Sequence, residues 1–382
     1  MVEYASIGSL LKRKRVKAKN TNFNAPVYAV TNNNGFVLSA SLHDFTIHSE
    51  DTSNYMVVEE NDFAYNPSRL NIGSIAYFKH EGKGLVSPMY VVFHADENKI
   101  LPQYLFVVMK SGEIMNKIDS LKEVGARFRF DFSRWDLIQI PIPSISEQTR
   151  IVGILDTFTA SIENLKEQIA ERRKQYEHYR DQLLDLEGKE GVEMKTIKEV
   201  FDTRNGYTPS TNNPEFWDNG TLPWFKMEDI RDNGRFLNDS ILHITPKAVK
   251  GKGLFKANSI ILATSATIGE HAIITVEHLS NQRFTNFYPK KMFEDRINMK
   301  FVYYYMFVID EWCKQHVNQG GFASVDMGGL YGLHFPIPSL EEQSRIVSIL
   351  DTFEASIANL EAQLKEREKQ YEYYRNKLLT FE

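Results

Sequence analysis

Hydrophobic residues recur with a helical period in two long stretches, one in the middle of the chain and one at its end. In the first stretch they step by alternating fours and threes through Ile151, Leu155, Phe158, Ile162, Leu165, Ile169, Arg172, Tyr176, Tyr179, Leu183 and Leu186. The second stretch repeats these steps through Ile346, Leu350, Phe353, Ile357, Leu360, Leu364, Arg367, Tyr371, Tyr374, Leu378 and Phe381. A spacing of about 3.5 residues held over about five heptads is typical of a coiled-coil seam and predicts two long helices.

The two stretches are copies of one another. Residues 141–187 and 336–382 align without gaps at an offset of 195 and are identical at 31 of 47 positions. Both copies open with Pro-Ile-Pro-Ser, and proline biases the residue before it away from the helical conformation. A glutamate follows each of the serines Ser144 and Ser339 by three residues, which is the pattern of a capping box. We therefore expect each helix to begin at its serine.

Each predicted helix would be roughly 60 Å long at about 1.5 Å per residue. A lone helix of this kind would leave an apolar stripe in water, and because the other copy carries the same stripe, each is the obvious partner of the other. Arg172 and Arg367 interrupt the two stripes at equivalent positions. They either fix the register of the pair or extend their guanidinium groups into solvent.

The two remaining segments hold about 140 residues each, which suits one domain apiece. Short β-like runs alternate with loops at Pro26–Val30, Ile75–Phe78, Met89–His94 and Ser259–Ala263. Helices are expected at Pro102–Ile118 and Asn298–Val317. We therefore predict an α+β class, with two mixed globular domains at residues 1–142 and 191–336 and long helices at 143–190 and 337–382.

Faint echoes connect the two globular segments. The sequence from Arg69 to Gly73 parallels that from Ser265 to Gly269, and Ser87–Phe93 parallels Asn281–Phe287. The segments are not otherwise copies. We infer one fold used twice, with its surface chemistry changed.

The net charge of -5 looks unfavourable for a nucleic-acid binder. Residues 1–140 and 194–335, however, each hold 16 basic and 15 acidic side chains, so the acidity lies in the two helical stretches. The charge therefore leaves the globular segments free to present basic patches. A basic run at Lys12–Lys19 is followed by no apolar segment, and no stretch approaches the roughly 20 apolar residues of a membrane span. The single cysteine, Cys313, fits a reducing cytoplasm, where we expect the protein to act.

Catalytic signatures are scarce. The sequence contains no phosphate-binding G-x-x-x-x-G-K-[ST], no G-x-G-x-x-G and no histidine or cysteine pattern for zinc. The best enzymatic candidate combines Asp62 with Glu81 and Lys83, in the loose D…E-x-K spacing of metal-dependent nucleases. Because E-x-K arises easily by chance, we expect these charges to be ordinary solvated surface. We predict no catalytic, cofactor or metal residues in this chain.

Polar and basic side chains suited to contacting phosphates and base edges occur in both globular segments. In the first they are Asn66, Ser68, Arg69, Lys83, Ser87, Tyr90, Arg127 and Arg129. In the second they are Tyr207, Thr208, Ser210, Lys226, Thr264, Ser265, Thr267, Gln282, Arg283 and Ser324. These residues are our candidates for DNA binding.

At this point the sequence resembles a known family. The repeated Pro-x-Pro-Ser-x-x-Glu-Gln-x-Arg-Ile-Val opening and its heptad helix are similar to the conserved regions of type I restriction–modification specificity subunits. The stretch from Phe201 to Ser210, Phe-Asp-Thr-Arg-Asn-Gly-Tyr-Thr-Pro-Ser, resembles the start of their target-recognition domains. The first segment departs from that Gly-x-Thr-Pro-Ser start and keeps only Asn34-Gly35 nearby.

The resemblance implies a non-catalytic subunit that binds double-stranded DNA. It implies two target-recognition domains separated by two helices paired as an antiparallel coiled coil, related by a pseudo-two-fold axis. Each domain would recognise one half of an asymmetric bipartite target, and the helix pair would set the spacer. The implied partners are two methyltransferase subunits and two motor–nuclease subunits, and these would carry S-adenosylmethionine, ATP and Mg²⁺. The alternative is a coiled-coil protein adaptor that binds no DNA.

Overall fold

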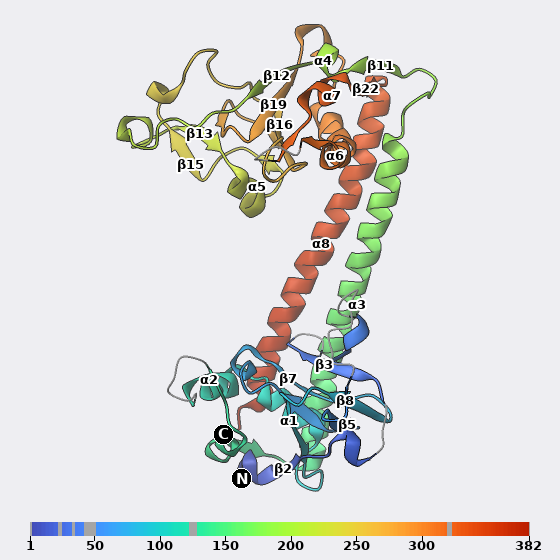
Figure 1. Ribbon diagram of the computed structural model, residues 1–382, viewed down its shortest axis with the longest axis vertical. Coiled ribbons are helices and arrows are strands. Elements are labelled where there is room, and N and C mark those ends of the chain that lie inside the picture. The colour runs from blue at the N-terminus through green and yellow to red at the C-terminus, as the bar shows by residue number, and fades with distance from the viewer. Residues whose placement is uncertain are drawn as a thin grey trace. The chain divides into compact units, whose positions relative to one another are not determined.

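A computed structural model describes residues 2–21, 25–32, 35–41, 51–121, 128–318 and 323–381 (Figure 1). The chain divides into two compact units. Unit 1 comprises residues 1–167 and 361–382, and unit 2 comprises residues 168–360. Both chain ends therefore belong to unit 1. No described helix is both long and apolar enough to cross a membrane.

Unit 1 is a mixture of short strands and helices. Its strands are β1 (Glu3–Ser6), β2 (Leu11–Lys14), β3 (Val27–Thr31), β4 (Gly35–Leu38), β5 (Met56–Glu59), β6 (Phe63–Tyr65), β7 (Ile75–Tyr77), β8 (Lys83–Val86), β9 (Val91–Ala95) and β10 (Gln139–Ile142). Its helices are α1 (Pro102–Met109), α2 (Gly112–Ser120), the first part of α3 (Ile145–Leu184) and the last part of α8 (Leu340–Leu379). Short 3-10 turns connect several of these elements.

Unit 2 is built from the same kinds of element. Its strands are β11 (Glu193–Thr196), β12 (Phe201–Asn205), β13 (Leu222–Phe225), β14 (Phe236–Leu237), β15 (Leu242–Ile244), β16 (Ser259–Ala263), β17 (His271–Ile274), β18 (Leu279–Ser280), β19 (Phe284–Pro289), β20 (Val317–Asn318), β21 (Ser324–Val325) and β22 (His334–Ile337). Its helices are the last part of α3, α4 (Ile197–Val200), α5 (Met227–Asn233), α6 (Met299–Gln315), α7 (Met327–Gly332) and the first part of α8.

The sheets of the two units have the same strand order. In unit 1 the order is β2-β9-β6-β7, and in unit 2 it is β12-β19-β16-β17, with β14 added at the edge. A second sheet also corresponds, because β3 pairs antiparallel with β4 and parallel with β8, as β13 does with β15 and β18. A two-strand ribbon precedes each long helix, β1–β10 in unit 1 and β11–β22 in unit 2. The prediction of one fold used twice is therefore confirmed.

The strand registers align the two units residue by residue. Phe93 and Phe287 are the last residues of the two similar sequences noted above. In unit 1 Phe93 pairs with Arg13 and Phe63. In unit 2 Phe287 pairs with Thr203 and Ile260. Arg13 therefore corresponds to Thr203, and Phe63 to Ile260.

A turn of unusual geometry supports this alignment. Asn61 and Asn258 lie two residues before Phe63 and Ile260, and both adopt the left-handed conformation, with φ of 66° and 55°. Among residues with a side chain, asparagine adopts this conformation most readily. The same turn thus precedes the central strand in both units.

The long helices begin where the sequence predicts. Ser144 Oγ accepts the backbone N–H of Glu147 (3.3 Å), and Ser339 makes the same bond in the second copy (3.2 Å). The other half of the predicted capping box is replaced, because the Glu147 carboxylate binds Arg150 instead. The seam prediction was wrong at its last residues, since α3 ends at Leu184 and α8 at Leu379.

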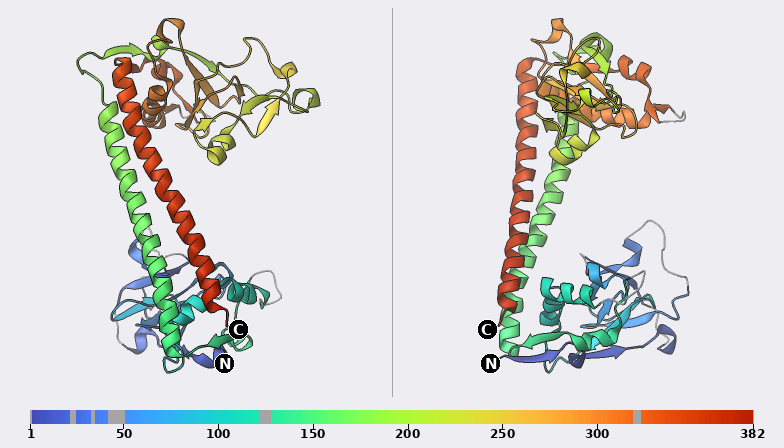
Figure 2. Two further views of the ribbon diagram at one scale, coloured as in Figure 1. Left: turned by 180° about the vertical axis from the view of Figure 1, so that it is seen from behind. Right: turned by 90° about the vertical axis from the view of Figure 1, so that its left-hand side faces the viewer.

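The two long helices pack together in both units (Figure 2). In unit 1 Phe158 stacks on Tyr374 with ring centroids 5.2 Å apart, and in unit 2 Tyr179 stacks on Phe353 at 5.4 Å. Phe158 and Phe353 are 195 residues apart, as are Tyr179 and Tyr374, so one pair of repeat positions makes both contacts. The periodic stripe thus faces the partner helix, as expected from its spacing.

The two arginines of the stripe cover aromatic rings. The Arg172 guanidinium lies 5.9 Å from the ring centroid of Phe353, and the Arg367 guanidinium lies 5.7 Å from that of Phe158. Both arginines are half-buried. A guanidinium over a ring face is attracted by the ring quadrupole, which makes a charged residue tolerable at a seam position.

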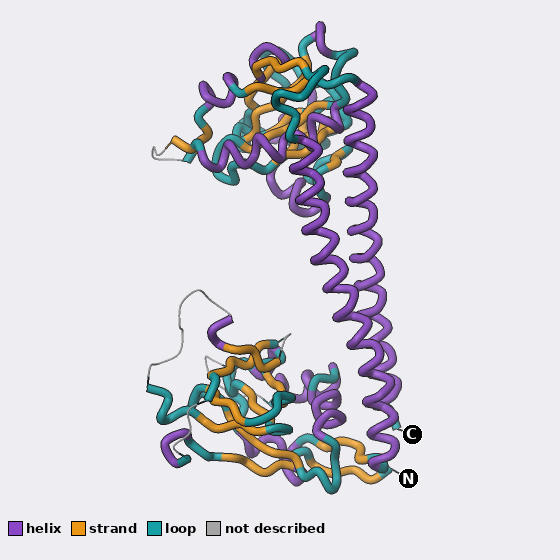
Figure 3. The backbone as a smooth tube through the Cα atoms, turned by 90° about the vertical axis from the view of Figure 1, so that its right-hand side faces the viewer, coloured by secondary structure: helices purple, strands orange, loops and turns teal. Residues whose placement is uncertain are grey.

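One buried glutamine in each long helix joins the helix to its domain. Gln148 Oε1 accepts the backbone N–H of Leu101 at 2.8 Å, and its amide group donates to two backbone carbonyls. Gln343 makes the equivalent bonds, accepting the N–H of Asn298 at 2.8 Å. Both side chains are fully buried. Figure 3 shows most strands of each unit lying to one side of the long helices.

The helix expected at 102–118 is in fact two helices, α1 and α2. Ser111 breaks it, because its hydroxyl caps α2 by accepting the N–H of Ile114. The preceding Lys110 donates to the carbonyls of Asn32 and Gly73 at 2.9 Å each. The corresponding helix of unit 2, α6, is a single helix of 17 residues, close to its prediction.

Candidate nucleic-acid interface

The candidates of unit 2 gather at one end of three adjacent strands, β12, β16 and β19 (Figure 1). Tyr207, Thr208 and Ser210 follow the end of β12, while Thr264, Ser265 and Thr267 follow β16, and Gln282 and Arg283 precede β19. Antiparallel pairing brings these three strand ends to the same edge of the sheet. Ser324 joins them through its bridge to Ser265, and Lys226 follows the end of β13.

Some of these side chains are exposed and some hold the edge together. Thr208, Ser210, Gln282 and Arg283 are exposed, and Thr208 Oγ1 donates to Gln282 Oε1 at 2.5 Å. Thr264 is buried, and its hydroxyl lies 3.0 Å from that of Thr285. Thr264 therefore supports the edge, whereas the four exposed residues are available to a ligand.

Tyr207 anchors the segment that follows β12. Its ring packs in a small core beside Trp224, whose indole N–H donates to the Tyr207 carbonyl at 3.0 Å. Its hydroxyl donates to the Ala248 carbonyl at 3.1 Å and accepts the N–H of Lys250 at 2.8 Å. The preceding Gly206 is required, because a Cβ there would lie 2.2 Å from the carbonyl oxygens of residues 280 and 281. Both residues thus shape the loop.

In unit 1, the loop after β6 and the loop before β9 lie side by side. The Asn66 side-chain amide lies 3.9 Å from Met89 Sδ, and the Phe130 N–H donates to the Pro67 carbonyl at 2.9 Å. These contacts bring the candidates Asn66, Ser68, Arg69, Ser87 and Arg129 into one region. Arg127 lies outside the described residues.

The residues of this region divide as they do in unit 2. Ser68, Arg69 and Arg129 are exposed. Asn66 is largely buried, and its Oδ1 accepts the Ser68 N–H at 3.0 Å, so it builds the turn. Tyr90 is half-buried and its hydroxyl accepts the Val30 N–H at 3.3 Å.

Lys83 stands apart from this group, in an ion-pair network at the other end of β8. Lys83 and Lys14 both pair with Glu59, at 2.6 and 2.5 Å. These lysines lower the pKa of Glu59 to about 2 by hydrogen bonding and charge attraction. Asp62 pairs with Lys14 at 2.5 Å and lies 3.2 Å from His94. Lys83 is therefore a weaker DNA-binding candidate than its neighbours along the chain.

The same network bears on the nuclease alternative. Asp62 is buried, and its two carboxylate oxygens already receive Lys14, His94 and the backbone N–H of Glu59. Within the part of the chain that the structure describes, no cluster of three or more metal-ligating side chains occurs. The geometry gives the alternative no support.

The structure reveals DNA-binding candidates that the sequence alone did not indicate. Because β2 corresponds to β12, the segment after β2 corresponds to the loop of Tyr207 and Ser210. This segment carries Arg15, Lys17 and Lys19, of which Arg15 and Lys19 are exposed. The basic run was visible in the sequence, but its position at the strand end was not.

Two equivalent mixed domains, each followed by one copy of a long helix and each presenting polar side chains at its strand ends, define a duplicated recognition protein. The family model described as "Type I restriction modification DNA specificity domain" matches residues 2–172 and 189–369. The chain belongs to this family, and it is a specificity subunit of the type I restriction–modification class.

Individual relatives agree with this assignment. The chain is 32% identical to the EcoR124I/EcoR124II specificity subunit of Escherichia coli, over 100% of this chain and 94% of the relative. It is 49% identical to the EcoprrI specificity subunit of Escherichia coli over 53% of each chain.

Solved structures share the fold. A chain from a structure of the type I restriction–modification system, concerned with its assembly and conformational transition, has a TM-score of 0.67 and 17% identity. The match covers 99% of this chain and 97% of that one. The HsdS subunit from Thermoanaerobacter tengcongensis has a TM-score of 0.53 and 17% identity, covering 99% and 96%. At these identities the likeness concerns the fold.

Proposed function

We propose that this chain is the non-catalytic DNA-reading subunit of a type I restriction–modification enzyme, and that each globular domain reads one half of an asymmetric duplex target. The observation that carries this proposal is that one sheet order occurs twice, while the side chains at the corresponding strand ends differ. We assign the target-recognition domains to residues 1–142 and 191–336 and the conserved helices to residues 143–190 and 337–382.

The exposed candidates would make the direct DNA contacts. In unit 1 these are Ser68, Arg69 and Arg129, together with the newly found Arg15 and Lys19. In unit 2 they are Thr208, Ser210, Gln282 and Arg283, with Lys226, Ser265, Thr267 and Ser324 half-buried beside them. Arginine binds guanine edges and phosphates, and hydroxyl and amide groups contact bases and backbone. Asn66, Tyr90, Tyr207 and Thr264 would position these loops.

The long helices are proposed to form an antiparallel coiled coil with a pseudo-two-fold axis. In unit 1 Phe158 meets Tyr374 and Lys166 meets Glu368, so partner numbers fall as residue numbers rise. Such an axis would match the local two-fold symmetry of duplex DNA. The helix pair would then hold the two half-sites roughly one or two helical turns apart, each about 34–36 Å.

The methyltransferase subunits are proposed to dock on the acidic outer faces of the two helices. The buried Gln148 and Gln343 hold the domains and are not available for docking. Tyr373 is exposed along α8 and offers aromatic contact area. Two methyltransferase and two motor–nuclease subunits would complete the enzyme and carry its S-adenosylmethionine, ATP and Mg²⁺.

Selection of random duplex DNA tests the proposal. The purified chain, alone and with a candidate methyltransferase subunit, is used at two salt concentrations. We expect enrichment of two different short motifs at a fixed spacing. Salt-sensitive but sequence-blind binding would contradict bipartite reading, and no binding in either condition would favour the protein-adaptor alternative.

Removing one heptad from both helices tests the spacer role. Deleting residues 162–168 and 357–363 should shorten the accepted spacer and leave both half-sites unchanged, because the domains and their junctions are untouched. Selection from the same random library measures both quantities. Altered half-sites with an unaltered spacer would refute this role for the helices.

A further inference from the structure

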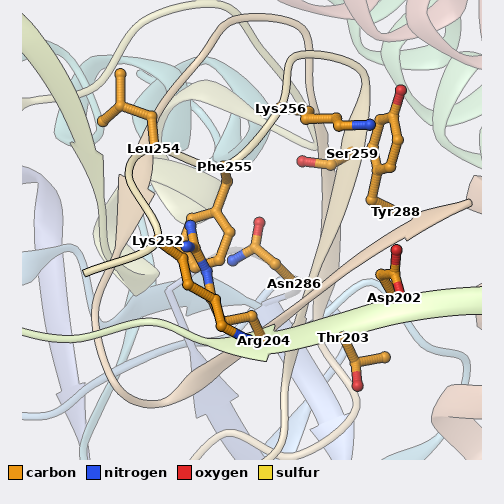
Figure 4. Close-up of a pocket in the computed structure, with 10 residues that line it drawn as sticks. All are labelled: Asp202, Thr203, Arg204, Lys252, Leu254, Phe255, Lys256, Ser259, Asn286 and Tyr288. Atoms are coloured by element: carbon orange, nitrogen blue, oxygen red, sulfur yellow. The ribbon is translucent and has the colours of Figure 1, made fainter. Parts of the chain in front are cut away.

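Unit 2 contains a cavity of about 400 Å³ on one face of its main sheet, between that sheet and the loop before β16 (Figure 4). Three cationic side chains line it, Arg204, Lys252 and Lys256. Ser259 also lines it, with a side chain only 1% exposed whose hydroxyl has no hydrogen-bond partner among the described residues. A buried hydroxyl without a partner is costly and calls for an explanation.

The strand registers identify the counterparts of these residues in unit 1. Arg204 pairs with residue 286 in β19 as Lys14 pairs with residue 92 in β9, so Arg204 corresponds to Lys14. Ser259 lies one residue before Ile260, as Asp62 lies before Phe63.

A second alignment fixes the counterpart of Lys256. The Phe255–His278 bridge of unit 2 corresponds to the Val58–Gly84 pair of unit 1. Lys256 is therefore the counterpart of Glu59. The six residues from this pair to the central strand align without a gap in the two units.

In unit 1 the positions equivalent to this part of the cavity lining carry two carboxylates, Asp62 and Glu59. The Lys14 ammonium lies 2.5 Å from both Asp62 Oδ2 and Glu59 Oε2. Asp62 is 2% exposed and Lys14 is 18% exposed, so this contact is largely shielded from water. A cation held between two carboxylates, one of them buried, is therefore part of the unit 1 scaffold.

In unit 2 the cation is kept and both carboxylates are lost. Arg204 stacks at 4.0 Å over the Phe255 ring and donates to the Gly253 carbonyl at 2.8 Å. Serine replaces the buried aspartate, and Lys256 replaces the glutamate. The local charge is thus reversed, and the shorter serine leaves open space where the carboxylate stood.

Two acidic groups of unit 2 offset part of this positive charge. Asp202 lines the cavity and is exposed, so water screens its charge. Glu294 pairs with Lys256 at 3.0 Å but does not line the cavity. The cavity lining therefore carries three cations and one solvated carboxylate, and Glu294 offsets part of the charge of Lys256.

We propose that this cavity binds a small oxyanion, the phosphate or carboxylate group of a small molecule, in the place that the Asp62 carboxylate occupies in unit 1. Arg204 and Lys256 supply charge-assisted hydrogen bonds, and the Ser259 hydroxyl donates the bond that it otherwise lacks. Asp202, Ser259 and Tyr288 lie at the strand ends opposite to the candidate DNA edge. Arg204 lies near the other end of β12, so competition with duplex DNA is needed to separate this ligand from the DNA backbone.

Calorimetric titration of the full chain with inorganic phosphate, and separately with acetate, tests this proposal. Ionic strength is held constant with chloride. We expect one saturable site for at least one of the two anions. Absence of saturable binding for both would overturn the proposal.

Ser259→Asp is the decisive variant, because it restores the carboxylate that unit 1 carries at this position. It should fold as the parent does and bind the anion at least about tenfold more weakly, which corresponds to about 1.4 kcal/mol. Lys256→Glu should act in the same direction and serves if the first variant fails to fold. Lys247→Glu makes the same charge change at an exposed lysine away from the cavity and should bind as the parent does. Equal affinity in all four proteins would refute the site.

Competition with duplex DNA separates the two sources of phosphate. The titration is repeated with the full chain saturated with its selected duplex. Undiminished anion binding supports a small-molecule site. Displacement of the anion by the duplex would assign the cavity to the DNA backbone and overturn the small-molecule proposal.

Discussion

The two units share one fold but carry different side chains at equivalent positions. At the strand ends, unit 1 presents mainly charged side chains, Arg15, Lys19, Arg69 and Arg129, whereas unit 2 presents several neutral hydrogen-bonding groups, such as Thr208. On the sheet face, the carboxylates of unit 1 give way to a cation-lined cavity in unit 2. The sheet order and the helix junction are therefore the same in both units, while the side chains projecting from them differ.

Replacing the buried glutamine of either helix junction should have the greatest effect on the free energy of unfolding. Gln343→Leu and Gln148→Leu each leave one backbone N–H and two carbonyls without their buried partner, so each should lower the free energy of unfolding of its own unit by about 3 kcal/mol. Hydrogen exchange, read separately on amides of the two units, measures this. Glutamate at either position keeps the acceptor oxygen, but its carboxylate cannot donate to the two carbonyls and buries a charge, so it should cost at least as much. A large effect in one unit and none in the other would show that the junctions are not equivalent.

A pH effect should separate the units next. His278 is buried in unit 2, and burial lowers its pKa from 6.5 to about 4, whereas its counterpart in unit 1 is Gly84. Between pH 6.5 and 4 the unfolded chain therefore binds a proton that the folded chain does not, so stability falls as the pH falls. The loss should approach about 3 kcal/mol below pH 4.

The His278→Gln variant isolates this contribution. Denaturant unfolding of unit 2 should become less steeply dependent on pH between 6.5 and 4. Part of the dependence should remain, because burial also lowers the pKa of His271. An unchanged pH profile in the variant would contradict the assignment.

Salt dependence sharpens the contrast between the strand ends. Replacing Arg15, Lys17 and Lys19 by serine should make the plot of log K against log salt shallower by about 0.9 per lost phosphate contact. Replacing Thr208 and Gln282 by alanine should leave that slope unchanged and weaken discrimination between sequences instead. Binding isotherms at several salt concentrations measure both. Equal loss of slope in both variants would contradict a charged first domain and a hydrogen-bonding second domain.

The smallest effect concerns the repeated helix contact. Tyr374→Ala removes the stack on Phe158, and Tyr179→Ala removes the stack on Phe353. The coupling energy across each pair should be about 1 kcal/mol, because stacked aromatic pairs contribute about 0.5–1.5 kcal/mol beyond their buried area. Double-mutant cycles with the facing phenylalanines give the two coupling energies. Unequal couplings would break the equivalence of the two contacts.

Much of the fold could be predicted because its elements are determined by local sequence patterns. The 3.5-residue period and the proline–serine openings predicted both long helices and their first residues, and Ser259–Ala263 was predicted as the strand it forms. The break between α1 and α2 was missed, because it depends on a serine cap whose neighbour, Lys110, bonds to distant carbonyls. Met89–His94 was shifted to Val91–Ala95, since residue 90 closes a turn on Ser87.

The candidate site was predicted in composition but not in arrangement. Among the unit 2 candidates the sequence could not distinguish the exposed Thr208 from the buried Thr264, since both are threonines in polar loops. In unit 1 it included Lys83, which pairs with Glu59, and it omitted Arg15 and Lys19. Burial and strand ends are properties of the paired sheet, so a single stretch of sequence does not contain them.

The sequence by itself determined that the chain is duplicated, that its helices pair through a periodic stripe, and that its family is that of type I specificity subunits. The first two follow from spacing and identity along the chain, and the third from motifs that resemble those of the family. Only the tertiary structure decided that Asp62 and Ser259 are counterparts. Their equivalence is set by hydrogen-bond register with strands far along the chain, and register constrains the backbone while leaving the side chains free to differ in charge.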